Sequence, residues 1–428
     1  MFNILRLEEI VNDQLKNLMS KDSGMERLID FDKYINSKQI VILSGIRRSG
    51  KSTLLKQFSE KLGGNFYYIN FDDERLMDFG VNDFDNLLTV WKKTNQSKNI
   101  FIDEVQNVES WERFVRRVYE EGYKVFITGS NAKLLSSELS THLTGRYFKI
   151  ELYPFSFKEV LSFNKIDFLT LSSNNRVEIT KKFDEYLVLG GFPEFITYKN
   201  REFLKRTYED VIYKDIITRF GIREITAFRE LSNFLFNNFT KKIGYQTIAK
   251  ALGIKSSISV RDYIGFLQES YLVFELFKYD YSLKRQYISD KKIYIIDNGM
   301  RNTVAFSFSE DKGRLLENLV FIELKRRGEE VYFSKDKGEC DFLIKDKSRI
   351  TSAIQVCYSL DEENEKREVK GLVEAINQNN LKNGLILTYG EEKEITLDNI
   401  NIKIMPVWKW LLGRDWQINI LVYNWYIK

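Results

Sequence analysis

The stretch Gly45-Ile46-Arg47-Arg48-Ser49-Gly50-Lys51-Ser52-Thr53 decides how the first part of this chain folds. It lies between an apolar run at 40–43 and a helix-forming run at 54–58, and it fits the phosphate-binding loop pattern G-x-x-x-x-G-K-[ST]. Backbone N–H groups and a helix N-terminus make such a turn a pocket for anions. Lys51 is expected to reach phosphate oxygens and Ser52 to ligate Mg²⁺. The stretch 45–53 therefore predicts a site for ATP and Mg²⁺.

A second motif lies about fifty residues further on, where an apolar strand at 99–102 ends in Asp103-Glu104. A carboxylate at this place in a nucleotide-hydrolysing protein holds Mg²⁺, which makes Asp103 a metal-site candidate. The adjacent Glu104 is the candidate general base for the attacking water. The pair is a weak signal alone and a strong one after a phosphate-binding loop.

Strands and helices alternate through this region, which predicts an α/β fold with a parallel sheet covered by helices on both faces. The nucleotide is expected beyond the carboxyl ends of the strands. A further strand at 124–128 ends in Gly129-Ser130-Asn131, so a polar side chain there is expected near the γ-phosphate or the water. Arg146 follows in Leu143-Thr144-Gly145-Arg146 and is a candidate to stabilise transition-state charge, in its own or a neighbouring subunit.

Composition limits the class of protein. The length of 428 residues suggests about three domains at ~150 residues each, and the net charge of +4 is too small to indicate nucleic acid by itself. One histidine, His142, leaves little material for Ser-His or Cys-His catalysis, and two cysteines make neither a disulfide framework nor a zinc site. No leader segment or membrane-length apolar run is present, so a cytoplasmic protein without membrane contact is expected.

The order of these motifs, followed by Pro154-Phe155-Ser156-Phe157, resembles the AAA-type P-loop ATPases of a large archaeal and bacterial group of uncharacterised ATP-binding proteins. The resemblance continues through Gly190-Gly191-Phe192-Pro193-Glu194, through the run 292–297 and through the run 313–318, and covers nearly the whole chain from about residue 38. It implies a sensor position at Ser130 or Asn131, and a sensor or finger role for Arg146.

Residues 229–280 have the pattern of a winged helix. Helices are predicted at Phe228–Phe239, Tyr245–Leu252 and Ser256–Gln268, followed by a wing strand at 271–276. In a helix-turn-helix the recognition helix enters the major groove of DNA. The residues expected to be exposed there are modestly basic and suit phosphate contacts: Lys255, Ser256, Ser257, Ser259 and Arg261. A winged helix used for packing is the alternative.

The last part of the chain resembles the PD-(D/E)XK nuclease core. A helix carries Glu317, a strand carries Asp341, and the next strand carries Gln355 and Cys357. Glu317, Asp341 and Gln355 match the metal positions, which makes them a vestigial metal site. Cys357 stands where the nuclease pattern has a lysine, so the fold is expected to persist without DNA cleavage.

The sequence thus predicts a P-loop AAA-type ATPase domain at 1–160, a helical lid or linker at 161–228, a winged helix at 229–289, and a nuclease-like domain at 290–428. The favoured function is a Mg²⁺-dependent ATPase acting on or with DNA. Association with further copies of the same chain, as a homo-oligomer, is also expected. Two alternatives stay open: an ATP-dependent switch that controls a protein–protein interaction, and a nuclease with a remodelled active site.

Overall fold

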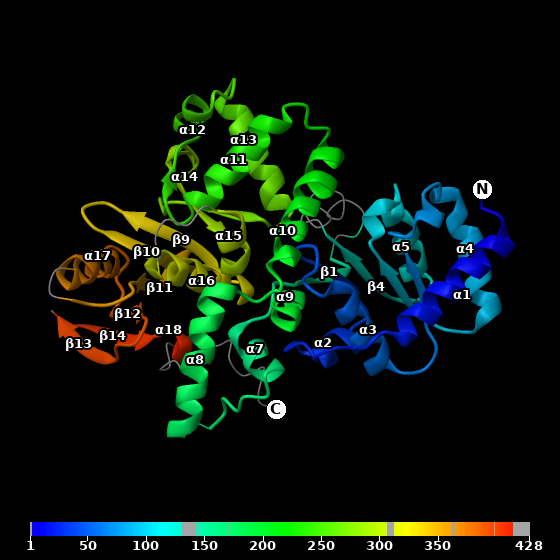
Figure 1. Ribbon diagram of the computed structural model, residues 1–428, viewed down its shortest axis with the longest axis horizontal. Coiled ribbons are helices and arrows are strands. Elements are labelled where there is room, and N and C mark those ends of the chain that lie inside the picture. The colour runs from blue at the N-terminus through cyan, green and yellow to red at the C-terminus, as the bar shows by residue number, and fades with distance from the viewer. Residues whose placement is uncertain are drawn as a thin grey trace. The chain divides into compact units, whose positions relative to one another are not determined.

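The computed structural model describes residues 2–130, 143, 145–170, 172–305, 312–361, 364–397 and 399–413. The chain divides into two compact units, Met1–Leu152 and a second that begins at Tyr153 (Figure 1). Asn131 and His142 lie outside the described residues. Within the described residues, no helix combines the length and the apolar composition that a bilayer span requires.

The first unit is built on a five-stranded parallel sheet with the order β2-β3-β4-β1-β5. The strands are β1 (Ile40–Ser44), β2 (Tyr67–Asn70), β3 (Asn99–Asp103), β4 (Lys124–Gly129) and β5 (Tyr147–Glu151). Parallel strands run as nearly continuous apolar segments because both faces of the sheet are buried. All five residues of β1 are buried.

Helices cover both faces of this sheet. Side chains alternate along each strand, so Ile42 and Ile102 join a core cluster with α1 (Ile4–Ser20), α4 (Phe84–Thr94) and α5 (Trp111–Glu120). The opposite face packs on α2 (Phe31–Ile35) and α3 (Lys51–Leu62). This arrangement confirms the predicted α/β fold class. The remaining short turns are η1 (Glu74–Leu76), η2 (Val81–Asp83) and η3 (Val105–Asn107).

The second unit begins with a helical region. Its elements are α7 (Phe157–Phe163), α8 (Ser173–Leu189), α9 (Pro193–Tyr198), α10 (Arg201–Asp210), the π-helix η5 (Val211–Thr218) and α11 (Ile225–Asn237). Then come α12 (Tyr245–Leu252) and α13 (Ser257–Glu269), which pack beside a three-stranded antiparallel sheet. That sheet has the order β6-β8-β7, from β6 (Lys242–Ile243), β8 (Lys291–Ile295) and β7 (Val273–Leu276). The central strand β8 falls within the range 290–428 that the sequence places in the last domain.

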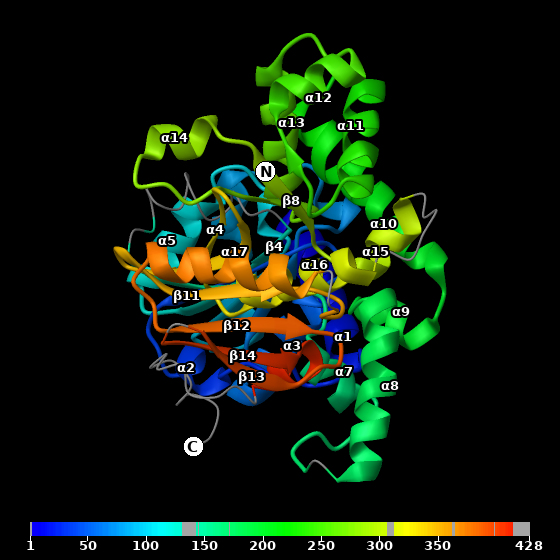
Figure 2. The ribbon, with the colours of Figure 1, turned by 90° about the vertical axis from the view of Figure 1, so that its left-hand side faces the viewer.

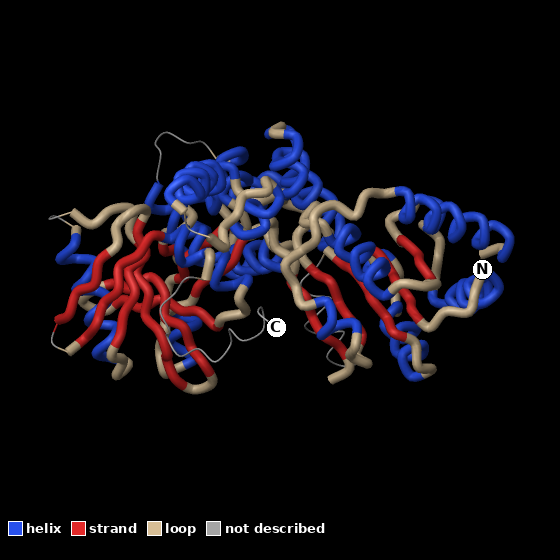
Figure 3. Tube along the Cα trace, turned by 90° about the horizontal axis from the view of Figure 1, so that it is seen from below, coloured by secondary structure: helices blue, strands red, loops and turns tan. Residues whose placement is uncertain are grey.

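A six-stranded mixed sheet forms the rest of the second unit, in the order β13-β14-β12-β11-β10-β9 (Figure 2). Its strands are β9 (Glu330–Lys335), β10 (Glu339–Asp346), β11 (Arg349–Val356), β12 (Asn383–Thr388), β13 (Lys393–Leu397) and β14 (Ile400–Pro406). Helix α17 (Glu365–Gln378) covers one face through an apolar cluster. In Figure 3 the strands of both units are red. The other helices are α14 (Leu283–Ile288), α15 (Asn298–Val304), α16 (Lys312–Arg326) and α18 (Val407–Leu411).

The Gly190-Gly191 pair fixes how the helical region meets α15. The buried carboxylate of Asp297 accepts hydrogen bonds from the backbone N–H groups of Gly191 (2.7 Å) and Met300 (2.9 Å). Gly190 has φ 73°, and a β-carbon on it would lie 2.1 Å from the Asp297 carboxylate. Burial raises the pKa of Asp297 to about 6. The glycines are therefore required by close packing against a buried acid.

Candidate functional site

The turn between β1 and α3 has the backbone of an anion-binding loop. Gly45, Arg48 and Gly50 all have positive φ (150°, 63° and 96°). A β-carbon on Gly45 would lie 2.1 Å from the carbonyl oxygen of Leu152, so the loop tolerates no side chain there. The loop leads directly into the N-terminus of α3 at Lys51, where unpaired N–H groups favour an anion.

Lys51 is buried, with 4% of its surface exposed. Its ammonium group donates to the backbone carbonyl oxygens of Gly45 (3.1 Å) and Ile46 (3.2 Å). Among the described residues it forms no ion pair with a carboxylate within 4.0 Å. A buried charge is costly unless it is paired, so this cation has capacity for an anionic ligand such as a phosphate group.

Asp103 lies at the end of β3 and is 2% exposed. It accepts a short hydrogen bond from the hydroxyl of Thr128, and Ser52 and Tyr68 also donate to it. Burial and the charge of Glu104 raise its pKa, while the Thr128 and Ser52 hydroxyls and the Lys51 charge oppose the rise. The pairing of a buried carboxylate with the Ser52 hydroxyl supplies hard oxygen donors of the kind that Mg²⁺ prefers.

Glu104 adopts a left-handed backbone conformation, with φ 50°, directly after β3. Its N–H donates to the Thr128 hydroxyl oxygen at 3.0 Å, so one threonine contacts both members of the Asp103-Glu104 pair. The carboxylate of Glu104 accepts a hydrogen bond from the Gln106 amide, which also lies 3.5 Å from the Ser130 hydroxyl oxygen. The Gln106 amide nitrogen thus connects the Glu104 carboxylate with the Ser130 hydroxyl. The sequence reading missed Gln106, because nothing in its spacing marks it.

Arg146 lies far from the loop of its own chain. Its carbonyl oxygen accepts the N–H of Ile40 at 2.9 Å, where β1 begins, whereas the phosphate-binding loop follows Ser44, where β1 ends. At ~3.3 Å per residue these two ends of β1 are roughly 15 Å apart. The guanidinium group pairs with Glu120 at 3.2 Å. This position suits contact with another molecule better than contact with the nucleotide of the same chain.

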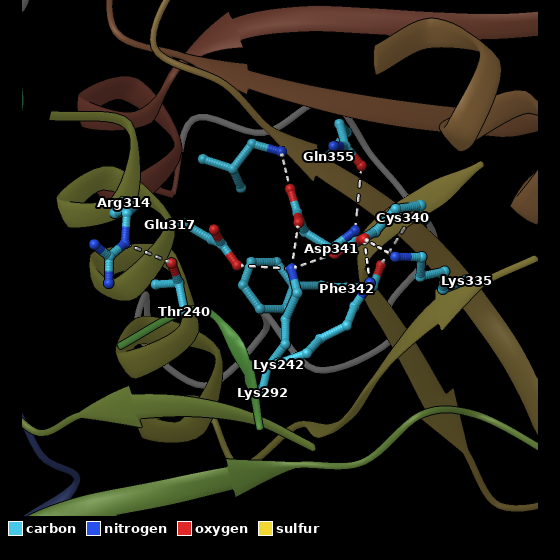
Figure 4. Close-up of polar contacts among 12 residues, drawn as sticks. Thr240, Lys242, Lys292, Arg314, Glu317, Lys335, Cys340, Asp341, Phe342 and Gln355 are labelled. Carbon is cyan, nitrogen blue, oxygen red and sulfur yellow. Dashed lines mark hydrogen bonds and ion pairs between the residues drawn. The ribbon is translucent and has the colours of Figure 1, made fainter. Parts of the chain in front are cut away.

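A second charged cluster lies in the other unit, at the nuclease-like positions. Glu317 of α16 and Asp341 of β10 converge, and the ammonium group of Lys292 lies between their carboxylates, 3.0 Å from Glu317 and 2.8 Å from Asp341 (Figure 4). Glu339 is a third carboxylate partner at 3.0 Å. Lys292 belongs to β8 and was not among the residues that the sequence reading associated with this site. Its ammonium lies among the carboxylates that the nuclease pattern assigns to a metal.

Gln355 and Cys357 do not complete a metal site. The Gln355 side-chain oxygen accepts the N–H of Asp341 at 3.2 Å, and its amide donates to Glu368 at 2.6 Å. Cys357 packs in the apolar cluster under α17, and burial raises the pKa of its thiol to about 12. Among the described residues, no group of three His, Cys, Asp or Glu side chains is arranged to hold a metal ion.

Electrostatics favour a charged lysine in this cluster. Burial disfavours the ammonium form of Lys292, but Asp341 and Glu317 outweigh burial and raise its pKa well above the ordinary value. Burial raises the pKa of Glu317 to about 7, against the opposing charge of Lys292. The hydroxyl of Tyr294 donates to the same Glu317 oxygen at 2.7 Å. The cluster is a satisfied ion-pair network that joins β8 to α16 and β10.

Three family models match consecutive parts of this chain. Residues 37–161 match an AAA domain, residues 180–311 match a domain of unknown function (DUF8612), and residues 312–410 match another (DUF4143). The AAA match confirms the resemblance to AAA-type P-loop proteins. The winged helix and the nuclease core stay predictions.

Two uncharacterized proteins are similar over almost their whole length. One, from Methanocaldococcus jannaschii, is 38% identical over 426 residues, which cover 95% of both chains. The other, from Haemophilus influenzae, is 32% identical and covers 93% of this chain and 99% of its own.

Two solved structures are similar to parts of this chain at low identity. The RuvB Holliday junction branch migration motor of Thermotoga maritima is 15% identical over 63% of this chain and 93% of its own, with a TM-score of 0.30. The ORC1 protein of Aeropyrum pernix, solved in complex with DNA, is 11% identical over 70% of this chain and 90% of its own, with a TM-score of 0.31. At these TM-scores the likeness carries no argument about function.

Proposed function

We propose that this chain, which belongs to the same family as the uncharacterized proteins of M. jannaschii and H. influenzae and carries an AAA domain, is a Mg²⁺-dependent ATPase that acts with DNA. One observation carries the ATPase part. The buried Lys51 ammonium in the glycine loop donates to neutral carbonyl groups, beside a buried Asp103 that is bonded to Ser52. A triphosphate supplies anionic oxygens for the Lys51 ammonium, which here donates to neutral carbonyl groups.

The loop and the residues at the ends of β3 and β4 then have the following proposed roles. Residues 45–53 wrap the phosphates, and Lys51 contacts their outer oxygens. Ser52 and Asp103 would hold Mg²⁺, which neutralises charge on the phosphates when it is bound. Glu104 takes a proton from the attacking water as its oxygen bonds to the γ-phosphorus, and ADP leaves. The sensor position is proposed to be Ser130 or Asn131.

Arg146 is proposed to act on the nucleotide of a neighbouring copy. The reason is its position at the amino ends of the strands, whereas its own phosphate-binding loop lies at their carboxyl ends. A cation supplied by another subunit stabilises charge that develops on the transferred phosphoryl group. The proposal implies a working homo-oligomer.

DNA is proposed to contact the winged-helix-like part of the second unit. The order α11, β6, α12, α13, β7, α14, β8 supports this interpretation, because three helices are followed by two paired antiparallel strands. On and beside α13 the side chains of Lys255 and Arg261 are 89% and 60% exposed. Each has a nearby acidic group, Glu224 at 3.6 Å and Asp262 at 3.1 Å, so weak binding with strong salt dependence is expected.

The C-terminal domain is proposed to be a nuclease-like fold that does not cut DNA. Its helix and strands bring Glu317 and Asp341 together, which supports the fold. Lys292 neutralises the same carboxylates, and Cys357 leaves no ammonium group at the pattern's lysine position. The Lys292 ammonium opposes a divalent metal between these acids, and the missing lysine removes the cation that the nuclease pattern uses to stabilise developing charge.

The deciding experiment measures phosphate release by the full-length protein with and without duplex DNA, in Mg²⁺ and in EDTA. We expect Mg²⁺-dependent turnover that DNA changes. Lys255→Ala/Arg261→Ala should lower DNA affinity and reduce the salt slope by roughly two, because two phosphate contacts are lost. Lys92→Ala/Lys93→Ala removes the same charge from the exposed face of α4 and serves as the control. Tight ATP binding without turnover would contradict the ATPase proposal and leave the regulatory switch.

A further inference from the structure

The turn after β3 brings a glutamine back to the carboxylate of Glu104. Glu104 is left-handed, and the 3-10 turn η3 follows at once. Val105 is 1% exposed and fixes this turn in the apolar core. Because the residue between them points into the core, Glu104 and Gln106 lie on the same side of the turn, where their side chains meet.

The two ends of the Gln106 amide have different surroundings. The nitrogen donates to Glu104 and lies 3.5 Å from the hydroxyl oxygen of Ser130. The oxygen is buried and has no hydrogen-bond donor among the described residues. A buried acceptor without a donor costs about 1–3 kcal/mol. This unmatched acceptor lies beside the carboxylate that is proposed to be the general base.

We propose that Gln106 positions the attacking water together with Glu104, an inference that rests on the proposed ATPase function. A water molecule that donates one O–H group to Glu104 and the other to the Gln106 amide oxygen has its lone pairs directed away from both. Its oxygen is then free to bond to the γ-phosphorus. The proton passes to Glu104, the bond between the γ-phosphorus and the bridging oxygen breaks, and ADP leaves. Gln106 stays neutral and accepts no proton.

Ser130 and Glu104 set the direction of the amide. Both are hydrogen-bond acceptors for the amide nitrogen, so the nitrogen is held toward them and the oxygen is held away. Ser130 follows β4 directly, and β4 pairs with β1 immediately before the phosphate-binding loop. The water-accepting oxygen is thereby fixed relative to the loop that binds the phosphates.

The test compares wild type with Gln106→Ala, Gln106→Met and Gln106→Glu. Gln106→Met keeps the side-chain length, so it reports on the amide even if Gln106→Ala lowers stability. The control is Asn107→Ala, because the Asn107 amide in the same turn donates to the Phe71 carbonyl and not to Glu104. Turnover is measured with Mg²⁺-ATP, and binding is measured separately with a fluorescent ATP analogue.

We expect Gln106→Ala and Gln106→Met to lower kcat about 10- to 100-fold with nucleotide affinity changed less than twofold. Gln106→Glu replaces the amide donor by a second carboxylate that repels Glu104, so kcat should fall in this variant as well. Asn107→Ala should keep the wild-type kcat.

The outcomes separate this inference from the ATPase proposal. Wild-type protein that binds but never hydrolyses ATP overturns both. Wild-type turnover that Gln106→Met leaves unchanged, or increases, overturns the role of Gln106 alone. A parallel loss of ATP affinity and kcat in Gln106→Met would show a structural role instead, and it would also contradict the inference.

Discussion

Two buried lysines, Lys51 in the first unit and Lys292 in the second, differ in what surrounds them. Each is 4% exposed. The ammonium of Lys51 donates to two neutral carbonyl groups of its own loop. The ammonium of Lys292 has three carboxylate partners at 2.8–3.0 Å. The two lysines are equally buried but differ in what they can bind. Lys51 can still contact an anionic ligand, whereas Lys292 already contacts carboxylates.

The carboxylates at the two sites differ in the same way. Asp103 is bonded to neutral hydroxyl groups, which leaves its charge available to a metal ion. One carboxylate oxygen of Asp341 accepts a hydrogen bond from Lys292, and the other accepts one from the N–H of Val356 at 3.0 Å. The two sheets thus carry similar acidic and basic residues, which have neutral partners at the first sheet and ionic partners at the second.

The largest effect is expected at the first lysine. Lys51→Ala should abolish tight ATP binding, because it removes the cation that contacts the phosphates. Glu104→Gln should keep binding and lose hydrolysis. Calorimetric titration with ATP and a phosphate-release assay separate the two variants. Wild-type turnover by Glu104→Gln would show that Glu104 is not the general base.

Arg146 tests whether the open site needs a second chain. Arg146→Ala should lower turnover about 10³-fold if it supplies the transition-state cation. Specific activity should then rise with protein concentration, and a mixture of Arg146→Ala and Lys51→Ala subunits should recover part of it. A concentration-independent rate without recovery on mixing would indicate a monomer that completes its own site.

Lys292→Met should destabilise the fold by about 3–5 kcal/mol, because it leaves buried carboxylates without their cation. Lys242→Met is the matched control, since Lys242 pairs with Glu339 alone among these acids and its side chain is 20% exposed. Urea denaturation measures both. Mn²⁺ should raise the Tm of Lys292→Met and not that of wild type. Equal losses for the two variants would contradict the central role given to Lys292.

A smaller effect concerns pH. The folded pKa of Lys292 lies well above its ordinary value of 10.5, because the carboxylates of Asp341 and Glu317 outweigh burial. Its contribution to the free energy of unfolding is therefore complete below pH 10.5 and is lost as the pH rises toward the folded pKa. The free energies of unfolding of wild type and Lys292→Met should therefore converge at pH values above the folded pKa of Lys292. A constant difference would show that the charge of Lys292 is not the source of its effect.

The phosphate-binding site could be predicted from sequence because its parts are local. Residues 45–53 form one turn and the start of α3, and Asp103 and Glu104 lie together at the end of β3, so the spacing along the chain was enough to predict a site. The parallel sheet followed from alternating apolar strands and helices for the same reason. Thr128 was not among the predicted site residues, because its two hydrogen bonds to Asp103 and Glu104 depend on the pairing of β3 with β4.

The second cluster could not be predicted because its decisive contact is between distant residues. Lys292 and Glu317 lie in two separate family motifs, the runs 292–297 and 313–318. Nothing in the sequence indicates that these motifs contact one another. The structure shows that these motifs contact one another, since Asn318 also exchanges hydrogen bonds with the backbone of Ile295 at 2.8 and 2.9 Å. Motifs without evident chemistry here prove to be complementary parts of one buried polar network.

The most direct test of the difference between the two sites counts bound Mn²⁺ by electron paramagnetic resonance, with and without a non-hydrolysable ATP analogue. We expect one Mn²⁺ per chain with the analogue and none without it. Lys51→Ala should abolish that ion, and Asp341→Ala should leave it unchanged. A Mn²⁺ ion that binds wild type without nucleotide and disappears in Asp341→Ala would contradict the account.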